Sequence, residues 1–597
     1  MGSLYSRPGG VLTKLLGVLV FFVAAPLGLD GCTFKSKIEP PHTIHLALEA
    51  KIDGLDPVYA DDLYAGMQST QAYEALFQYH YLKRPYTLIP SLAESMPEFS
   101  SDGLTLKIHL KKGVLFQDDP SFKSTQGKGR EMTADDVVFS FKRLADPKLV
   151  SPGWWIFEGK IVGLDEWRAA TAKQGSADYS QGVEGLKALD RYTVQLKLTK
   201  MSTQFMYYLA MPFTGIVPKE AVEFYGKEFL SHAVGTGPFR LVEFNPNSKI
   251  VWERNPTYRK ELYPNSGSPG DKEAGLLADA GKPLPLAERL VFQVFVEQQP
   301  MWLNFLSGKL DVSGIPKDDF GTAVTPQGEL SPDLKAKGIV LTKVPGLDVV
   351  HTTFNLEDPI LGKNKVLRQA MSLAYDTPTF IELFYNGRAI VAQGPIPPGL
   401  DGYDPHLKNP YQQFNVAKAK EFLAKAGYPN GKGLPVFEYA FVASSVSRQI
   451  AEYFQKMMSA IGINISMSSY SWPQFLEVVK NKKAQIWSYS WRADYPDAET
   501  FLQLFYSKNV APGPNDSNYS NPEFDRMYEK SLTLSPGTER TALYKAMAEL
   551  VIADCPWIFE AHRLTYGLNY PWLKNYKPHE FELSRYKYLR IDPNLKK

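Results

Sequence analysis

Segments in which hydrophobic and polar residues alternate recur along the chain, and this pattern predicts half-buried β-strands. Strands are predicted at residues 43–48, 104–110, 192–198, 239–244, 249–254, 290–296, 437–442, 463–467 and 486–490. Other segments carry apolar residues at spacings of three and four, which predicts helices with one buried face. Helices are predicted at residues 67–77, 133–143, 366–376, 417–426, 447–461 and 539–553. Because strands and helices alternate along the chain, we predict an α/β fold.

The segment from Ala233 to Tyr258 carries the strongest local turn signals of the chain. Gly235, Gly237 and Pro238 predict a tight turn, since Gly tolerates positive φ and Pro fixes φ near −65°. The strand 239–244 follows, and Asn245-Pro246-Asn247-Ser248 is typical turn chemistry before the strand 249–254. On spacing alone, this segment is an ordinary β-hairpin.

The identities of the residues in this hairpin are more informative than their spacing. Gly235-Thr236-Gly237-Pro238-Phe239, an aromatic strand and then Arg254-Asn255-Pro256-Thr257-Tyr258 resemble the signature of a bacterial family. It is the oligopeptide/dipeptide/nickel-binding family of extracellular solute-binding proteins, the capture subunits of ABC importers. Residues 111–119, 133–143 and 304–312 also resemble segments of that family, in the expected order.

The resemblance implies a two-lobed periplasmic-binding-protein fold with a hinge, built from three domains. The expected parts are a main domain of the first lobe at 41–78, 206–314 and 564–597, an extra small domain of that lobe at 79–205, and a second lobe at 315–563. The hinge is expected where the chain crosses between lobes, near residues 313–318 and 560–566. A chain of 597 residues is long enough for several cores of this kind.

Charge and cysteine content narrow the class of protein. Lys and Arg exceed Asp and Glu by only two, which argues against a nucleic-acid-binding protein with its usual basic surface. With two cysteines, Cys32 and Cys555, the chain has no disulfide framework. Cys555 lies in an apolar run and is expected to be a buried thiol.

The N-terminus has the pattern of a secretion signal, residues 1–31. Arg7 and Lys14 precede a short apolar stretch at 15–27, which is too short for a comfortable transmembrane helix. Leu29-Asp30-Gly31-Cys32 then resembles a bacterial lipobox, in which the cysteine is acylated and becomes the mature N-terminus. Asp30 is an unusual residue there, and ordinary secretory cleavage with an unmodified Cys32 is the alternative.

The sequence contains no recognisable catalytic motif. Metalloprotease, nucleophile-elbow, phosphate-loop and dinucleotide-binding patterns are all absent. His42 and His45 form the only close pair of histidines, which is weak support for a metal site. We therefore expect no enzymatic activity, no metal and no cofactor, although a catalytic triad assembled in space would leave no such motif.

The strongest candidate for ligand binding is Trp491-Arg492-Ala493-Asp494, at the end of a predicted strand. Asp497 has a local task as the cap of the next helix, whereas Asp494 has none. In the resembled family, the Asp of Trp-x-x-Asp accepts the ammonium group of a bound peptide, and Trp491 would wall a side-chain pocket. Ser490 to Arg492 would offer backbone groups to an extended peptide. The alternatives are a surface carboxylate beside Arg492 and a core tryptophan.

By the same resemblance, Trp472 is a second pocket aromatic, Asp61 and Asp62 lie where the first lobe meets the peptide, and Trp154 and Trp155 contribute aromatics from the extra domain. The chain also departs from the family. Family members that select short peptides by their C-terminus have basic residues where this chain has Ser488, Val479 and Ser447. The peptide length therefore stays open.

The resulting hypothesis is a monomeric, lipid-anchored, periplasmic receptor that binds a peptide between its lobes and delivers it to a membrane permease. Since a fold does not fix its ligand, an oligosaccharide, an opine or a nickel chelate stays open on the same scaffold. A secreted hydrolase is the alternative from another class of protein.

Overall fold

A computed structural model describes residues 39–60, 62–295 and 297–596. The secretion signal, Cys32 and Asp61 lie outside the described residues. The described chain forms two lobes, which we call the first and the second lobe, and each lobe is built on its own β-sheet.

The first lobe contains a four-stranded sheet in the order β1-β10-β9-β8. Its strands are β1 (Thr43–Leu48), β10 (Arg289–Val294), β9 (Lys249–Arg254) and β8 (Phe239–Asn245). β1 runs parallel to β10, and the other pairs are antiparallel. Its other elements are α1 (Leu63–Ala72), the strand pair β2 (Phe77–Tyr79) and β3 (Leu88–Pro90), α4 (Phe205–Tyr208), α5 (Lys219–Tyr225), and the pair β19 (Leu573–Lys574) and β20 (Arg590–Ile591).

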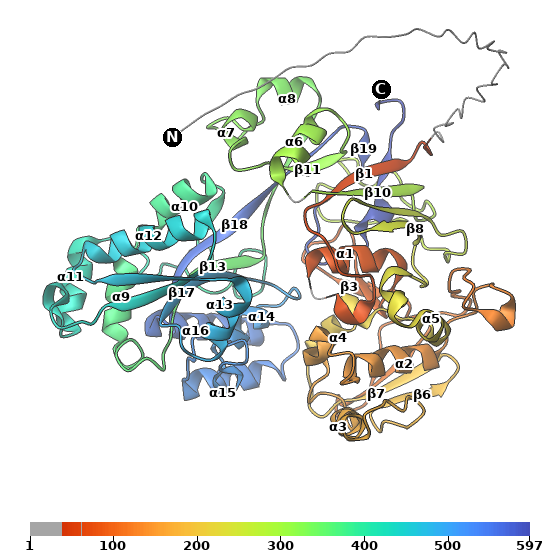
Figure 1. Ribbon diagram of the computed structural model, residues 1–597, viewed down its shortest axis with the longest axis horizontal. Helices are drawn as coiled ribbons and strands as arrows, with labels where there is room; N and C mark the ends of the chain where they lie inside the picture. The colour runs from red at the N-terminus through yellow and green to blue at the C-terminus, as the bar shows by residue number, and fades with distance from the viewer. Residues whose placement is uncertain (1–38, 61, 296, 597) are drawn as a thin grey trace, which may run out of the picture. The chain divides into compact units, whose positions relative to one another are not determined.

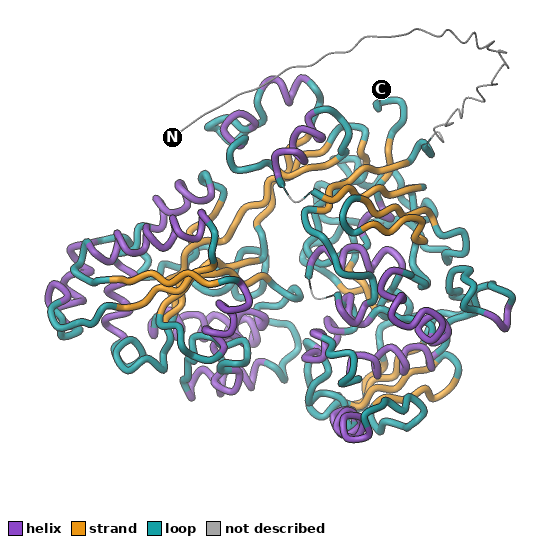
Figure 2. Tube along the Cα trace, viewed as in Figure 1, coloured by secondary structure: helices purple, strands orange, loops and turns teal. Residues whose placement is uncertain are grey.

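A second, smaller sheet of the first lobe has the order β4-β5-β7-β6. It consists of β4 (Glu98–Phe99), β5 (Thr105–His109), β7 (Thr193–Lys197) and β6 (Leu186–Asp190), with α2 (Ala134–Ala145) and α3 (Leu164–Gln174) beside it (Figure 2). Thr133 and Asp136 form a capping box at the start of α2, which overlaps the helix predicted at 133–143.

The second lobe contains an eight-stranded mixed sheet with the main order β11-β18-β13-β17-β15-β16. The strands are β11 (Val312–Gly314), β18 (Trp557–Asn569), β13 (Asp348–Phe354), β17 (Ile486–Arg492), β15 (Phe437–Val442) and β16 (Ile465–Tyr470), while β12 (Val340–Pro345) and β14 (Ala389–Val391) pair with β18. β18 is the longest of these strands, and its C-terminal end pairs with β11 (Figure 1).

Helices cover both faces of this sheet because successive strand residues point to opposite faces. Val350 and Ile558 pack with one group of helices, α9 (Lys365–Leu373), α10 (Thr377–Tyr385), α11 (Val416–Lys425) and α12 (Ser445–Ser459). Val349 and Phe559 pack with the other group, α14 (Glu499–Leu502), α15 (Pro522–Ser531) and α16 (Thr538–Asp554). α13 (Trp472–Lys480) packs on Trp487, and α6 (Gln298–Leu306), α7 (Phe320–Ala323) and α8 (Pro332–Ala336) share a core near β11.

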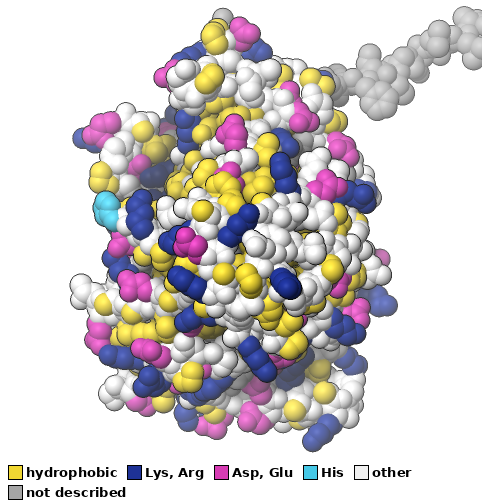
Figure 3. Space-filling model, turned by 90° about the vertical axis from the view of Figure 1, so that its left-hand side faces the viewer, with side chains coloured by type: hydrophobic (Ala, Val, Ile, Leu, Met, Phe, Trp, Pro, Cys, Tyr) yellow, Lys and Arg dark blue, Asp and Glu magenta, His cyan; other side chains and the backbone are white. Residues whose placement is uncertain are grey.

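On the face of the molecule shown in Figure 3, Lys and Arg side chains lie among Asp and Glu side chains rather than in one large patch. This mixed surface agrees with the small net charge of +2. It lacks the broad basic field with which proteins attract nucleic acids.

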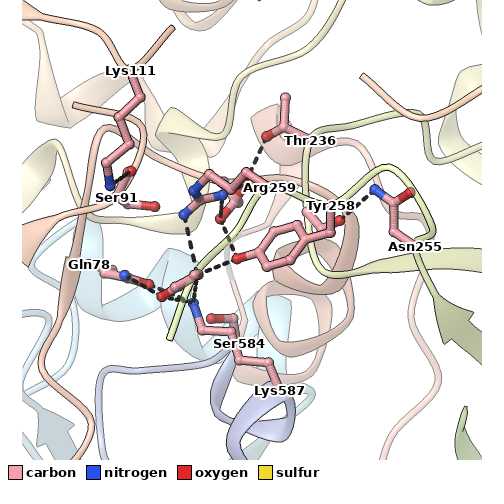
Figure 4. Close-up of polar contacts among 12 residues, drawn as sticks. Gln78, Ser91, Lys111, Thr236, Asn255, Tyr258, Arg259, Ser584 and Lys587 are labelled. Atoms are coloured by element: carbon pink, nitrogen blue, oxygen red, sulfur yellow. Dashed lines mark hydrogen bonds and ion pairs between the residues drawn. The ribbon is translucent and has the colours of Figure 1, made fainter. Parts of the chain in front are cut away.

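In the first lobe, a network of buried charged side chains contacts the signature segment, residues 233–258 (Figure 4). Glu74 accepts hydrogen bonds from Thr236 Oγ1 at 3.0 Å and from Arg259 Nη1 at 2.6 Å. Lys587, of which only 1% is exposed, donates from Nζ to Glu261 Oε1 at 3.1 Å. Burial alone would raise the pKa of Glu261, but Lys587 and Arg259 outweigh it and hold that pKa well below its usual range. The network joins the signature to chain segments far away in sequence.

Three details differ from the sequence-based expectations. The helix predicted at 67–77 ends at Ala72, because the backbone of Leu76 and Phe77 bonds to neighbouring segments instead. Gly235 and Gly237 do not adopt positive φ; their role is close approach to the backbone of residue 72. Residues 262–285 are rich in Gly, Pro, Asn, Asp and Lys, which predicts an exposed, mobile loop, but ion pairs from Asp271 and Asp279 connect this loop to the C-terminal segment.

We predict that Gly235→Ala destabilises the protein. A Cβ at Gly235 would overlap the carbonyl group of Ala72, which is main chain and cannot swing aside. The free energy of unfolding should fall by about 1–3 kcal/mol, measured by denaturant unfolding. Gly182→Ala is the matched control, since its Cβ meets nothing within 4 Å and its φ needs no glycine. Equal stability of the two variants would contradict the close-approach role.

Candidate functional site

Strand β17 carries the predicted site residues on one stretch of backbone. Ser490 lies opposite Val350, and Arg492 lies opposite Asp348, in the antiparallel ladder with β13. On its other side, β17 pairs with β15 only through Ile486 and Trp487. Within the described part of the chain, the stretch 488–492 therefore has a neighbouring strand on one side only. Its other edge keeps backbone donors and acceptors for an added chain.

A cavity of about 310 Å³ lies beside this stretch, and we call it the aromatic pocket. Its wall includes Ser488, Ser490, Trp472, Tyr385 and Tyr439. Trp472 is half-exposed and stacks on Phe475 with 5.8 Å between ring centroids, so a ligand can reach its ring. The pocket is suited to an apolar or aromatic side chain, with serine hydroxyls at its rim.

A larger cavity, of about 500 Å³, adjoins the aromatic pocket, and we call it the arginine pocket. Arg388, Arg492 and Arg563 line it from the second lobe, and Glu49 and Tyr64 line it from the first lobe. Two contacts connect the pockets. Tyr385 lines both of them, and Nη2 of Arg563 donates to Oγ of Ser490 at 3.2 Å.

Asp494 is half-buried just beyond the end of β17. Its Oδ2 accepts a hydrogen bond from Oγ1 of Thr500 at 3.1 Å, and no described Lys, Arg or His side chain forms an ion pair with it. Burial raises the pKa of Asp494 to about 6, although the bond from Thr500 opposes the shift. A carboxylate in this state gains from any cation that binds next to it.

The loop of Asp494 faces an aromatic cluster of the first lobe. Tyr495 contacts Tyr207 in a stacked geometry and Tyr208 edge-on, each with 5.6 Å between centroids. The charge of Asp494 contributes to the raised pKa of Tyr208, after burial and the charge of Glu499. Asp494 therefore lies on the side of the second lobe that faces the first.

Asp497 has a structural role that is larger than a helix cap. Its Oδ1 accepts from the backbone N–H of Glu499 at 3.0 Å and from the hydroxyl of Tyr544 at 2.7 Å. Its Oδ2 lies 3.0 Å from Nη2 of Arg540, and both side chains are buried. The N-cap position itself belongs to Ala498, one residue later than expected.

The other predicted site residues occupy separate places. Trp491 is half-buried and packs against the core formed by α14, α15 and α16. Asp62 caps α1, accepting from the backbone N–H groups of Tyr64 and Ala65. Trp154 is buried under Arg168, whereas Trp155 contacts Tyr208 edge-on at 5.6 Å between centroids. None of these four residues lines the two pockets.

Sequence reasoning missed Arg388, Arg563, Tyr385 and the buried Glu560. Glu560 is completely buried below the aromatic pocket, accepts from Thr352 Oγ1 at 2.6 Å, and has its pKa raised to about 7 by that burial. None of these residues carries a local spacing that marks a site.

Among the described residues, no cluster of three or more His, Cys, Asp and Glu side chains is arranged to hold a metal ion. None of the described helices combines the length and the apolar character needed to span a bilayer. Cys555 is a buried free thiol, as expected, and burial raises its pKa to about 12.

Comparison with curated proteins gives relatives along most of the chain. Heme-binding protein A of Haemophilus influenzae is 27% identical over 536 residues, covering 88% of this chain and 87% of that protein. Dipeptide-binding protein of Escherichia coli is 27% identical over 491 residues, covering 80% of this chain and 81% of its own. Di/tripeptide-binding protein 2 of Pseudomonas aeruginosa is 24% identical over 600 residues, covering 98% of this chain and all of that protein.

Solved structures share the fold. The periplasmic binding protein DppA of Helicobacter pylori, in complex with the peptide STSA, matches with a TM-score of 0.69 and 24% identity, covering 92% of this chain and 98% of its own. HbpA2 of Haemophilus parasuis matches with a TM-score of 0.70 and 24% identity, covering 92% of this chain and all of its own. These matches confirm the predicted two-lobed α/β fold.

A family model covers residues 87–513. This range includes β17, the Trp-x-x-Asp loop and those second-lobe residues of the two pockets that precede residue 513. The resemblance found in the signature hairpin therefore extends over most of the described chain, and the family comprises binding proteins that work outside the cytoplasm. This chain belongs to the bacterial extracellular solute-binding proteins, family 5.

Proposed function

We propose that this chain is the substrate-binding component of an ABC importer, which binds peptides between its lobes and delivers them to a membrane permease. The observation that carries the proposal is the combination of Asp494 with the open edge of β17. A peptide has an ammonium group for the carboxylate and a backbone for the edge, and both chemistries are present within a few residues.

The open edge favours a peptide over a sugar or a metal chelate. Residues 488–492 offer backbone N–H and C=O groups at the regular spacing of a strand, which only another extended chain matches throughout. The aromatic pocket beside Ser488 and Ser490 would then take a ligand side chain. Two of the relatives carry dipeptide or di/tripeptide binding in their names, which is consistent with this proposal.

The remaining sequence-based expectations form part of the same proposal. Ligand contacts are assigned to Ser490, Trp491, Arg492, Trp472, Asp494, Asp61, Asp62, Trp154 and Trp155. Cys32 would carry the lipid that anchors a monomeric receptor at the periplasmic face of a membrane. The three-domain boundaries and the hinge near 313–318 and 560–566 are proposed with it; β18 passes through the second of these segments while pairing with β12 and β14.

We predict that Asp494→Asn weakens peptide binding without harming the fold. The variant keeps the shape of the side chain but removes the charge that would pair with the peptide ammonium. Deleting one partner of a buried ion pair typically costs about 3–5 kcal/mol, which is roughly a hundredfold or more in affinity. Titration calorimetry with free and N-acetylated tripeptides checks this, alongside hemin, oligosaccharides and nickel chelates as other ligands. Equal affinity for free and acetylated peptides would refute the role of Asp494.

We further predict that peptide affinity falls as the pH is lowered from 7 to 5. Only the ionised carboxylate attracts the ammonium, and Asp494 in the free protein has a pKa of about 6. At pH 5, about one-tenth of the free protein is ionised there, so affinity should fall about tenfold. Glu499 and Glu560 also have pKa values raised to about 7, so the Asp494→Asn variant serves as the control. If the peptide affinity of the Asp494→Asn variant depends on pH as it does in the wild type, another group causes the effect.

Asp497→Ala should affect stability and spare binding. It removes the partner of Arg540 and leaves that guanidinium buried without a counter-charge, in addition to losing the bond to the N–H of Glu499. The free energy of unfolding should fall by about 3–5 kcal/mol, more than the ~1 kcal/mol of a cap alone. Denaturant unfolding measures the loss, and calorimetry on the folded variant measures binding. A loss near 1 kcal/mol would mean that the Arg540 pair contributes little.

A further inference from the structure

The arginine pocket contains more guanidinium groups than its carboxylates neutralise by direct contact. Arg563 forms an ion pair through Nε with Asp348, and Arg492 forms one through Nη2 with Glu580. Among the described residues, Arg388 makes no ion pair with a carboxylate. Glu49, the third carboxylate of the pocket, also makes no ion pair among the described residues, and burial raises its pKa.

Arg388 is held in place by neutral contacts. Its Nη1 donates to the carbonyl of Ile315 at 3.1 Å, its Nε donates to the carbonyl of Tyr385 at 3.2 Å, and its guanidinium lies 4.5 Å from the ring centroid of Phe320. These contacts fix the guanidinium plane and leave Nη2 without a partner among the described residues. Partial burial lowers the pKa of Arg388, because water is removed from a charge that no anion compensates.

Part of the Arg563 guanidinium group is also available to a ligand. Its Nε pairs with Asp348 and its Nη2 bonds to Ser490, while 42% of the side chain is exposed and the residue lines the arginine pocket. Tyr385 lines both pockets and accepts a hydrogen bond from Nε of Arg388, while Arg563 bonds to Ser490 of the aromatic pocket. The two arginines therefore border the place where the two cavities meet. A planar anion is the group that two guanidinium forks bind best.

The geometry points to Arg388, assisted by Arg563, as the anchor for the C-terminal carboxylate of a short peptide. This inference rests on the proposed function and adds how the C-terminus of the ligand is bound, which the sequence left open. The family positions for a basic anchor are Ser488, Val479 and Ser447 in this chain, and the two arginines supply the charge from other elements. The side chain of the last peptide residue would enter the aromatic pocket.

The same contacts set an upper limit on the length of the peptide. Ser490, the contact of Arg563, precedes Asp494 by four residues, which is at most about 13 Å along an extended chain. A peptide of about three residues spans about 10 Å, and the reach of the Asp and Arg side chains covers the remainder. The ligand class is therefore a short peptide of about three residues, with a free C-terminus and an apolar or aromatic last side chain.

The test compares Ala-Ala-Phe with its C-terminal amide by titration calorimetry. The wild type should bind the free acid about tenfold or more tightly than the amide, since a hydrogen bond to a charged group contributes at least that much. Arg388→Gln should remove this preference by weakening the acid and leaving the amide unchanged. Arg388→Lys should keep part of it, because the charge remains while the fork is lost. A structural role alone would weaken both ligands equally.

Arg526→Gln is the matched control, because Arg526 is exposed on α15 and makes no ion pair with a described residue. It should bind both ligands like the wild type. Equal affinity of the wild type for acid and amide would overturn the anchor, and this comparison holds even if Arg388→Gln fails to fold. Absence of binding by any peptide would overturn the proposed function and this inference with it.

Discussion

The first lobe depends on one buried set of charges, Glu74, Arg259, Glu261 and Lys587. Burying any one of these charged groups by itself would cost free energy, because the group would lose its contact with water. The ion pairs among the four groups offset this cost when all of them come together. They come from the segment before β2, the end of the signature and the C-terminal segment. The lobe can therefore reach its final packing only after the chain has returned from the second lobe, so the two lobes cannot be independent units in sequence.

The second lobe is organised by hydrophobic packing on both faces of one sheet. Alternate residues of β13 and β18 supply two separate cores, and the helices divide between them. At the end of β17, Trp491 packs against the core of α14, α15 and α16, whereas Ser488 and Ser490 line the aromatic pocket. Polar residues can therefore occupy the pocket side of this strand while other residues of the same strand take part in the core.

Local patterns predicted much of the fold and little of the site. The strands at 43–48, 249–254 and 437–442 have the bounds that the sequence predicts, because polar or turn-forming residues lie close to both ends of each apolar run. The helix predicted at 67–77 instead runs from Leu63 to Ala72, because the backbone beyond it bonds to residues 91, 93 and 209. Asp494 could be found through a motif, whereas Arg388 and the Asp497–Arg540 pair depend on contacts between segments distant in sequence. No local pattern records such contacts.

The one-sided pairing of β17 has a consequence for the solubility of the unoccupied protein. An open strand edge accepts any extended chain, including a segment of another copy, and soluble proteins keep such edges short or charged. Here the open edge covers only residues 488–492, ends in the exposed Arg492 and adjoins a pocket rich in charge. A ligand bound there as proposed would occupy the same backbone groups that a second copy would use. Ligand binding and self-association would then exclude each other at this edge, and the ligand would protect the protein from aggregation through it.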